Sequence, residues 1–235
     1  MVSKNTRMGW NNAASAPFSR VLFFLVCLCL HVITRAAEDT KTSKSNRELL
    51  QQVTVAVAKS ELDKLKKLVE QDHASVNEKD IYSVSLLHMV SIRCKPDIMS
   101  YLIDQGAEVN AQLTDVAGHR AGETPLHFAT SSRQIECVKL LIERGADITL
   151  AAREGLTPVH VAAGIGHSDI LKVFIDNGAD INIEADNDYG SLPIHLAATS
   201  GDLESVKMLI DHGAEVSASF RHFSLIASVH EPILT

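Results

Sequence analysis

The chain has 235 residues, of which 46% are apolar but only 5% aromatic, so a core must be built from Leu, Ile, Val and Ala. This length accommodates one or two domains with packed interiors. The formal net charge of −7 argues against nucleic acid as the main partner, because a phosphate-binding surface needs a basic patch.

The first 37 residues contain no Asp or Glu and include a continuous apolar run from Val21 to Leu30. Basic residues precede the run, and small residues follow it, with a cleavage point expected after Ala36. These features are typical of a secretory signal peptide. The run is also shorter than the roughly 20 residues that a membrane span needs. We therefore expect residues 1–36 to be a cleaved leader and the chain to enter the secretory pathway or be secreted.

Two other interpretations of the leader stay open. An uncleaved segment would act as a short anchor and make the membrane a partner, which it otherwise is not. A leader used for organelle import, or not used at all, would place the chain elsewhere, including the cytoplasm, although mitochondrial transit peptides are amphipathic rather than solidly apolar. Residues 37–47 are mostly charged and polar and are predicted to form a linker.

From residue 48 onward the chain repeats itself with a period close to 33 residues. The histidine that ends each four-residue marker recurs at steps of 39, 33 and 35 residues. A Gly-Ala pair recurs in phase with it. A fixed period between about 20 and 50 residues indicates stacked structural repeats. The markers are Ser85-Leu86-Leu87-His88, Thr124-Pro125-Leu126-His127, Thr157-Pro158-Val159-His160 and Leu192-Pro193-Ile194-His195.

Each period predicts the same local structure. Thr124 is suited to cap a helix, and Pro125 suits the first helical position, where an N–H would be unpaired anyway. A short helix rich in Ala should follow, then a tight turn and a longer helix with apolar pairs four residues apart, such as Val138 and Ile142. Gly145 is typical of a helix end. The segment after each Gly-Ala pair should form a β-hairpin.

This pattern resembles the ankyrin repeat, a β-hairpin followed by two antiparallel helices. The resemblance covers residues 48–219 and implies an all-α ankyrin solenoid with short β-hairpin loops between antiparallel helix pairs. A degenerate first repeat lacks the Thr-Pro-Leu-His marker. The tail at 220–235 carries no repeat markers, so it either caps the array or indicates that the chain is a shortened form of a longer one. The five repeats are predicted at 48–79, 80–112, 119–151, 152–184 and 187–219, with six extra residues at 113–118.

The resemblance also assigns the marker histidines a structural role. In ankyrin repeats this histidine forms hydrogen bonds that join neighbouring loops. One histidine per repeat is not a cluster with zinc-ligand spacing. The chain contains no recognisable catalytic motif. We therefore expect no catalytic site, no cofactor and no metal. The residues assigned this structural signature are His88, Thr124, Pro125, His127, Thr157, Pro158, His160, Pro193 and His195.

Only Cys94 and Cys137 lie outside the leader. A small secreted scaffold that depended on disulfides would carry more cysteines, so the sequence favours free thiols over a bridge. Cys137 is expected to fill the core, and Cys94, at the turn between two helices, is a candidate reactive thiol.

The resemblance implies a monomeric, non-enzymatic module that binds a protein through hairpin tips and first helices. Tyr and Arg often anchor such interfaces, although an ordinary solvated surface is the competing interpretation for each residue. Two other functions stay open: a membrane-tethered intracellular regulatory or scaffold subunit, and a secreted effector or toxin-like protein. The candidates at the tips are Tyr82, Arg120, Glu123, Arg153, Glu154, Leu156, Asp188 and Tyr189, and those at the ends of the first helices are Ile92, Arg93, Ile165 and Thr199.

Overall fold

The computed structural model describes residues 44–79, 83–114, 121–187 and 190–216. The chain divides into two parts, Met1–Lys41 and Thr42–Thr235, and the described residues all belong to the second. The predicted leader, the tail at 220–235 and four predicted tip residues therefore lie outside the described residues. These four are Tyr82, Arg120, Asp188 and Tyr189.

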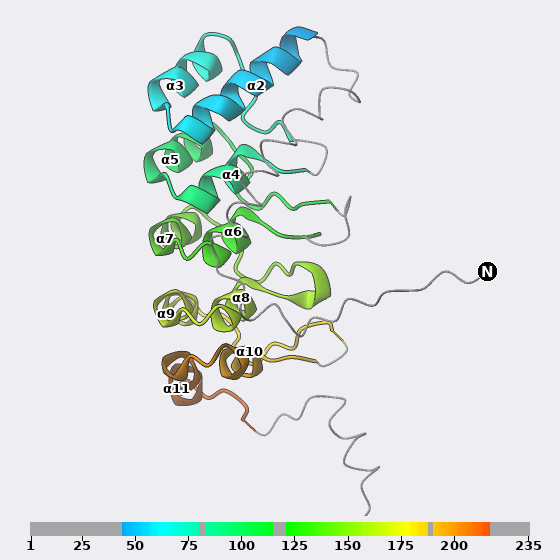
Figure 1. The fold of residues 1–235 in the computed structure, drawn as a ribbon, viewed down its shortest axis with the longest axis vertical. Coiled ribbons are helices and arrows are strands. Elements are labelled where there is room, and N and C mark those ends of the chain that lie inside the picture. The colour runs from blue at the N-terminus through cyan, green and yellow to red at the C-terminus, as the bar shows by residue number, and fades with distance from the viewer. Residues whose placement is uncertain (1–43, 80–82, 115–120, 188–189, 217–235) are drawn as a thin grey trace, which may run out of the picture. The chain divides into compact units, whose positions relative to one another are not determined.

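Five pairs of helices follow one another along the described chain (Figure 1). The marker-bearing helix of each later pair is short and comes first. Between α7 and α8 there is also a 3-10 turn, η2 (Arg153–Gly155). The pairs are α2 (Lys44–Lys59) with α3 (Leu62–Glu70), α4 (Leu86–Arg93) with α5 (Pro96–Asp104), α6 (Pro125–Ser131) with α7 (Ile135–Glu143), α8 (Pro158–Gly164) with α9 (Ser168–Asp176), and α10 (Pro193–Ser200) with α11 (Leu203–Asp211).

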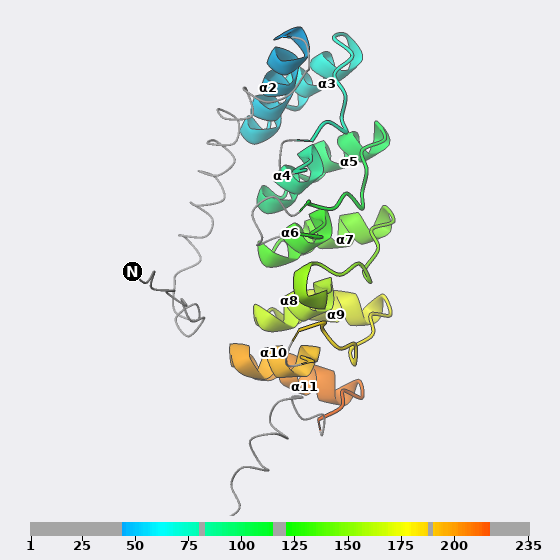
Figure 2. The same cartoon turned by 90° about the vertical axis from the view of Figure 1, so that its right-hand side faces the viewer.

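The helices form two layers (Figure 2). Helices α4, α6, α8 and α10 stack upon one another in one layer, and α5, α7, α9 and α11 stack in the other. Each helix contacts its pair partner, and successive helices of each of these two layers contact one another. The loops that precede the first helices project beside the first layer (Figure 1). The all-α solenoid is therefore confirmed.

The loops are hairpin-like, but none of the described ones contains a named strand. One isolated bridge joins Lys79 to Ser85. In the loop before α6, the N–H of Leu113 donates to the carbonyl of Glu123 at 3.0 Å, and the N–H of Gly122 donates to the carbonyl of Leu113 at 2.9 Å. These few bonds hold the two sides of a loop together without forming a sheet.

The first helices begin where their polar markers predict. Thr124 is the residue before α6, and its hydroxyl accepts the N–H of His127 while the imidazole of His127 accepts the N–H of Thr124 at 3.2 Å. Two otherwise unpaired donors at the helix start are thereby satisfied. Pro125 occupies the first turn, where a missing N–H costs nothing. The Ser85–His88 and Thr157–His160 pairs form the same arrangement.

The core lies between the two helix layers and is continuous along the array. Leu102, Leu141, Phe174 and Leu209 occupy the same position in the second helices of successive repeats, and all are fully buried. Burying each such side chain contributes roughly 1.5–3 kcal/mol. Small residues such as Ala162 separate the stacked first helices and allow their close approach.

The first helix of the array begins earlier than the sequence predicts, and the last repeat is more exposed than the repeats in the interior. Helix α2 begins at Lys44, inside the segment predicted to be a linker. At the other end, Leu203 and Val216 are 63% and 65% exposed. Ala198 is exposed as well, whereas Ala163, its equivalent one repeat earlier, is fully buried. Among the described residues, no helix is long and apolar enough to cross a membrane.

Candidate protein-binding surface

The candidate surface consists of helices α4, α6, α8 and α10 with the loops that precede them, and is called the loop-and-helix face below. Buried histidines fix the loops on this face. The Nε2 atoms of His88, His127 and His160 lie 3.2, 3.1 and 3.1 Å from the carbonyl oxygens of Glu123, Leu156 and Ser191. Each carbonyl belongs to the loop of the next repeat.

The surrounding groups determine which imidazole nitrogen carries the proton. The Nδ1 atom of His127 accepts the backbone N–H of Thr124, so it must be unprotonated. The Nε2 atom faces a carbonyl oxygen, which can only accept, so Nε2 carries the proton and donates. The histidine therefore bridges two repeats as a neutral ring.

Burial keeps these rings neutral. It lowers the pKa of His88 and of His127 to about 4, and the carbonyl hydrogen bond opposes the shift in part. The pKa of His160 is lowered for the same reason. A positive charge on a ring enclosed by helices would lose its hydration, so the uncharged form predominates at neutral pH. The neutral rings therefore serve as hydrogen-bonded links between neighbouring repeats.

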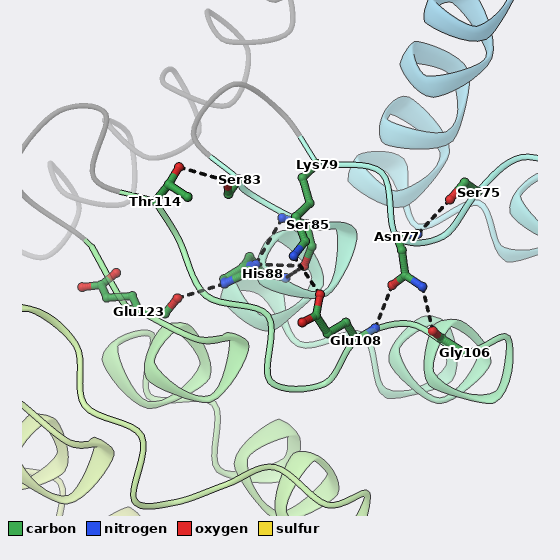
Figure 3. A network of polar contacts seen from close by, with 10 residues as sticks. All are labelled: Ser75, Asn77, Lys79, Ser83, Ser85, His88, Gly106, Glu108, Thr114 and Glu123. Carbon is green, nitrogen blue, oxygen red and sulfur yellow. Dashed lines mark hydrogen bonds and ion pairs between the residues drawn. The ribbon is translucent and has the colours of Figure 1, made fainter. Parts of the chain in front are cut away.

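A row of asparagines forms a second set of links between repeats, which sequence reasoning missed. Asn77 donates from Nδ2 to the carbonyl of Gly106 at 2.8 Å, and its Oδ1 accepts the N–H of Glu108 at 2.8 Å (Figure 3). Asn110 and Asn182 make the same pair of bonds to the repeats that follow them. Their shared position was the signal available in the sequence. Asn110 and Asn182 each lie four residues after the glycine of a Gly-Ala pair, and Asn77 lies four residues after His73, which stands in place of that glycine.

The junction between the third and fourth repeats departs from this pattern because Thr149 occupies the asparagine position. Both the N–H and the hydroxyl of Thr149 donate to the carboxylate of Asp147, at 2.8 and 2.7 Å. These hydrogen bonds lower the pKa of Asp147. The threonine thus closes a local turn instead of reaching the next repeat.

Arg153 and Glu154 project from the loop before α8. Their side chains are 50% and 51% exposed and lie 4.0 Å apart. The backbone beneath them is fixed, since the N–H of Arg153 donates to the carbonyl of Ala121 at 2.8 Å. Leu156, in the same loop, is half-buried. This loop therefore presents two charged side chains on a well-held backbone.

The other described candidates occupy varied environments. Glu123 is half-buried, and its carbonyl receives the histidine bond of the preceding repeat. Ile165 is half-buried, and its carbonyl accepts a bond from Arg133. Arg93 is exposed and donates to the carbonyl of Ala58 at 3.0 Å, which links it to the first repeat. Thr199 is exposed. Arg93 and Thr199 therefore remain accessible at the ends of their helices.

Ile92 differs from the expectation that it contacts a partner. It is only 6% exposed and packs with Leu113 and Phe128 in a small apolar cluster separate from the main core. Leu113 belongs to the six extra residues at 113–118, so the enlarged loop places an apolar side chain against the end of α4. The insertion buries Ile92 and removes it from the accessible surface.

The preference for free thiols is also wrong in this structure. Cys94 and Cys137 form a disulfide, with 5.6 Å between their Cα atoms. Cys94 lies in the turn after α4, and Cys137 lies in α7 of the next repeat. Stacking of adjacent repeats brings the turn of one above the second helix of the next. Sequence spacing did not show this proximity because 43 residues separate the two cysteines.

Comparison with known proteins identifies the family. The family model described as ankyrin repeats matches residues 53–152 and 149–219, and the chain belongs to this family. Ankyrin repeats are protein–protein interaction modules, and the repeat domain itself is not catalytic.

Curated relatives match in the repeats alone. Palmitoyltransferase Hip14 of Drosophila melanogaster is 37% identical over 84 residues, which cover 36% of this chain and 12% of that protein. Human palmitoyltransferase ZDHHC13 is 36% identical over 88 residues, covering 37% and 13%. Human ankyrin repeat and SOCS box protein 16 is 40% identical over 68 residues, covering 29% and 14%. The chain thus spans 12–14% of the length of these relatives.

Proposed function

We propose that this chain is a non-enzymatic binding protein that recognises a protein partner through its loop-and-helix face. The observation that carries the proposal is the loop before α8. Its backbone is tied to the preceding loop through Arg153 and to α6 through Leu156, while the side chains of Arg153 and Glu154 extend into solvent. A backbone that is already held loses little further freedom on binding, so the ordering cost is confined to the side chains.

Apolar surface next to these charges supports the same face. Leu156 and Ile165 belong to the same repeat as Arg153 and are half-buried, so each leaves part of an apolar side chain accessible. Interfaces commonly combine apolar contact with arginine anchors. On the second-helix layer of the same repeat, Lys172 and Asp176 of α9 form an exposed ion pair of similar exposure, which provides a matched comparison.

The decisive experiment compares two double variants of the same repeat. Arg153→Ala with Glu154→Ala changes the loop, and Lys172→Ala with Asp176→Ala changes α9. The two pairs are matched in exposure, at 50% and 51% against 58% and 54%. A partner recovered by affinity capture with the wild-type chain should bind the α9 variant normally and the loop variant at least fivefold more weakly. Equal binding by all three proteins would refute the loop-and-helix face.

We also propose that the chain enters the secretory pathway. The acid-free, apolar leader supports this location, and so does the disulfide, since such bonds persist in oxidising compartments. Expression of the full chain in eukaryotic cells, with N-terminal sequencing and fractionation, tests it. We expect cleavage after Ala36 and protein in the medium. An intact Met1 on protein retained at the membrane would instead support the tethered regulatory subunit.

A secreted effector that acts on another cell remains the second functional candidate after export. The same captured partner separates it from an extracellular binding protein. A partner of the secreting cell supports the proposed module, and a cytosolic partner of a different cell supports the effector. Sequence relatives do not choose between them, since the matched repeats occur in both palmitoyltransferases and a SOCS box protein.

A further inference from the structure

The turn between the two helices of each repeat adopts a left-handed backbone. Its residues are Ser60, Cys94, Arg133, Gly166 and Gly201, and φ at these positions lies between 45° and 76°. Glycine tolerates this conformation, whereas a residue with a Cβ atom is strained. Cys94, with φ 45° and ψ 95°, therefore has a backbone conformation that is unfavourable for a residue with a Cβ atom.

Side chains at this level connect neighbouring repeats. Arg133 donates to the carbonyl of Ile165 in the next repeat, and Arg93 donates to Ala58 in the preceding one. Cys94 makes the corresponding connection between the second and third repeats, but through a covalent bond to Cys137. Cys137 is fully buried in α7. The disulfide thus joins a strained turn to the core of the adjacent repeat.

The end of α4 depends on this turn. Cys94 directly follows Ile92 and Arg93, the last two residues of α4. Ile92 packs against Leu113 and Phe128, so the position of the helix end also affects these two side chains. The bond therefore anchors the end of α4, a helix of the loop-and-helix face, to α7 of the second-helix layer.

We propose that the Cys94–Cys137 disulfide is a redox-controlled staple that holds the end of α4, with Ile92 packed on Leu113 and Phe128, in the binding conformation. This inference rests on the proposed function of the loop-and-helix face. With the bond intact, the second and third repeats present one surface. After reduction, the left-handed turn loses its covalent restraint, the end of α4 loosens, and the partner binds less tightly.

The chemistry requires a dithiol reductant. Cys94 is half-buried at a turn, whereas Cys137 is fully buried, so the reductant thiolate attacks the sulfur of Cys94. The bond between the two protein sulfurs breaks, and its electron pair leaves on Cys137, which takes up a proton. The second reductant thiol then attacks the mixed disulfide and releases Cys94 as a thiol. The reductant becomes a disulfide, and the protein gains two electrons and two protons.

The test applies dithiothreitol to the full chain and follows two properties. Hydrogen exchange at the amides of Ser91 to Arg93 should become at least tenfold faster after reduction, while exchange in α11 stays unchanged. Affinity for the captured partner should fall at least fivefold. A Cys94→Ser, Cys137→Ser variant should match the reduced wild type in both properties and show no response to dithiothreitol.

Full chain that retains the leader also carries Cys27 and Cys29, and a Cys27→Ser, Cys29→Ser variant of it is the matched control, which should keep the full response to dithiothreitol. Oxidised protein with two titratable thiols at Cys94 and Cys137 would overturn the proposal, as would identical exchange and affinity in the two redox states. The exchange measurement needs no partner. Faster exchange with unchanged affinity would therefore refute control of binding, whereas failure of the Arg153 and Glu154 comparison would refute the binding face itself.

Discussion

Replacing His127 with Ala tests whether the histidine bridges stabilise the array. The substitution removes a fully enclosed ring that joins α6 to the next loop. Thr124 is only 1% exposed, and its backbone N–H loses its acceptor. The carbonyl of half-buried Leu156 loses its donor. A buried polar group without a partner costs about 1–3 kcal/mol. The half-buried carbonyl should cost about 1 kcal/mol because water can reach it.

The cavity left by the ring adds to these losses, so we expect a decrease of about 3–5 kcal/mol in the free energy of unfolding. Urea unfolding followed by far-ultraviolet circular dichroism measures it. His195→Ala is the matched control, because His195 occupies the same position in the last described repeat but is only half-buried. A loss below about 1 kcal/mol for His127→Ala, or equal losses for the two variants, would refute the reasoning.

Three further outcomes follow from the same contacts. Because burial lowers the pKa of His88 and His127 to about 4, against about 6.5 in an unfolded chain, their contribution to stability is complete above about pH 6.5 and is lost as the pH falls towards 4. Urea unfolding at several pH values should show a loss of about 1.4 kcal/mol per pH unit from each histidine, and a pH-independent midpoint in this window would contradict it. Thr149→Asn should restore the missing asparagine link and raise the free energy of unfolding by about 1 kcal/mol in a urea titration. No gain would show that the next repeat does not place its carbonyl and N–H within reach of this asparagine. Gly155→Ala should lower Tm more than Gly145→Ala. Both glycines have positive φ, but only the Cβ added at Gly155 would collide with the backbone of Asp186 in the next loop. Equal shifts in Tm would refute the collision.

Sequence reasoning succeeded where one residue type acts through local geometry. Thr124 precedes α6 and Pro125 lies in its first turn, as the marker predicts, because both residues act within a single helical turn. The period of the markers then fixed the order of the helix pairs. The asparagine links were accessible by the same logic, since Asn110 and Asn182 each lie four residues after a helix-ending glycine.

Prediction failed where two repeats meet through residues that follow no common spacing. The position of Cys94 over Cys137 depends on the left-handed turn and on the stacking offset between repeats. The burial of Ile92 depends on Leu113, which belongs to an insertion and therefore has no equivalent elsewhere in the array. Neither contact can be read from the repeat pattern, because each is a departure from it.

The histidine bridges have a consequence for how such a chain can diversify. Each bridge ends on a main-chain carbonyl, at Glu123, Leu156 or Ser191, and every amino acid supplies that group. Ser191 is only 4% exposed, but a mutation at half-buried Glu123 or Leu156 alters a side chain that a partner can reach while the bond to the carbonyl persists. Natural variation can therefore explore new specificities one loop at a time, with little penalty in folding.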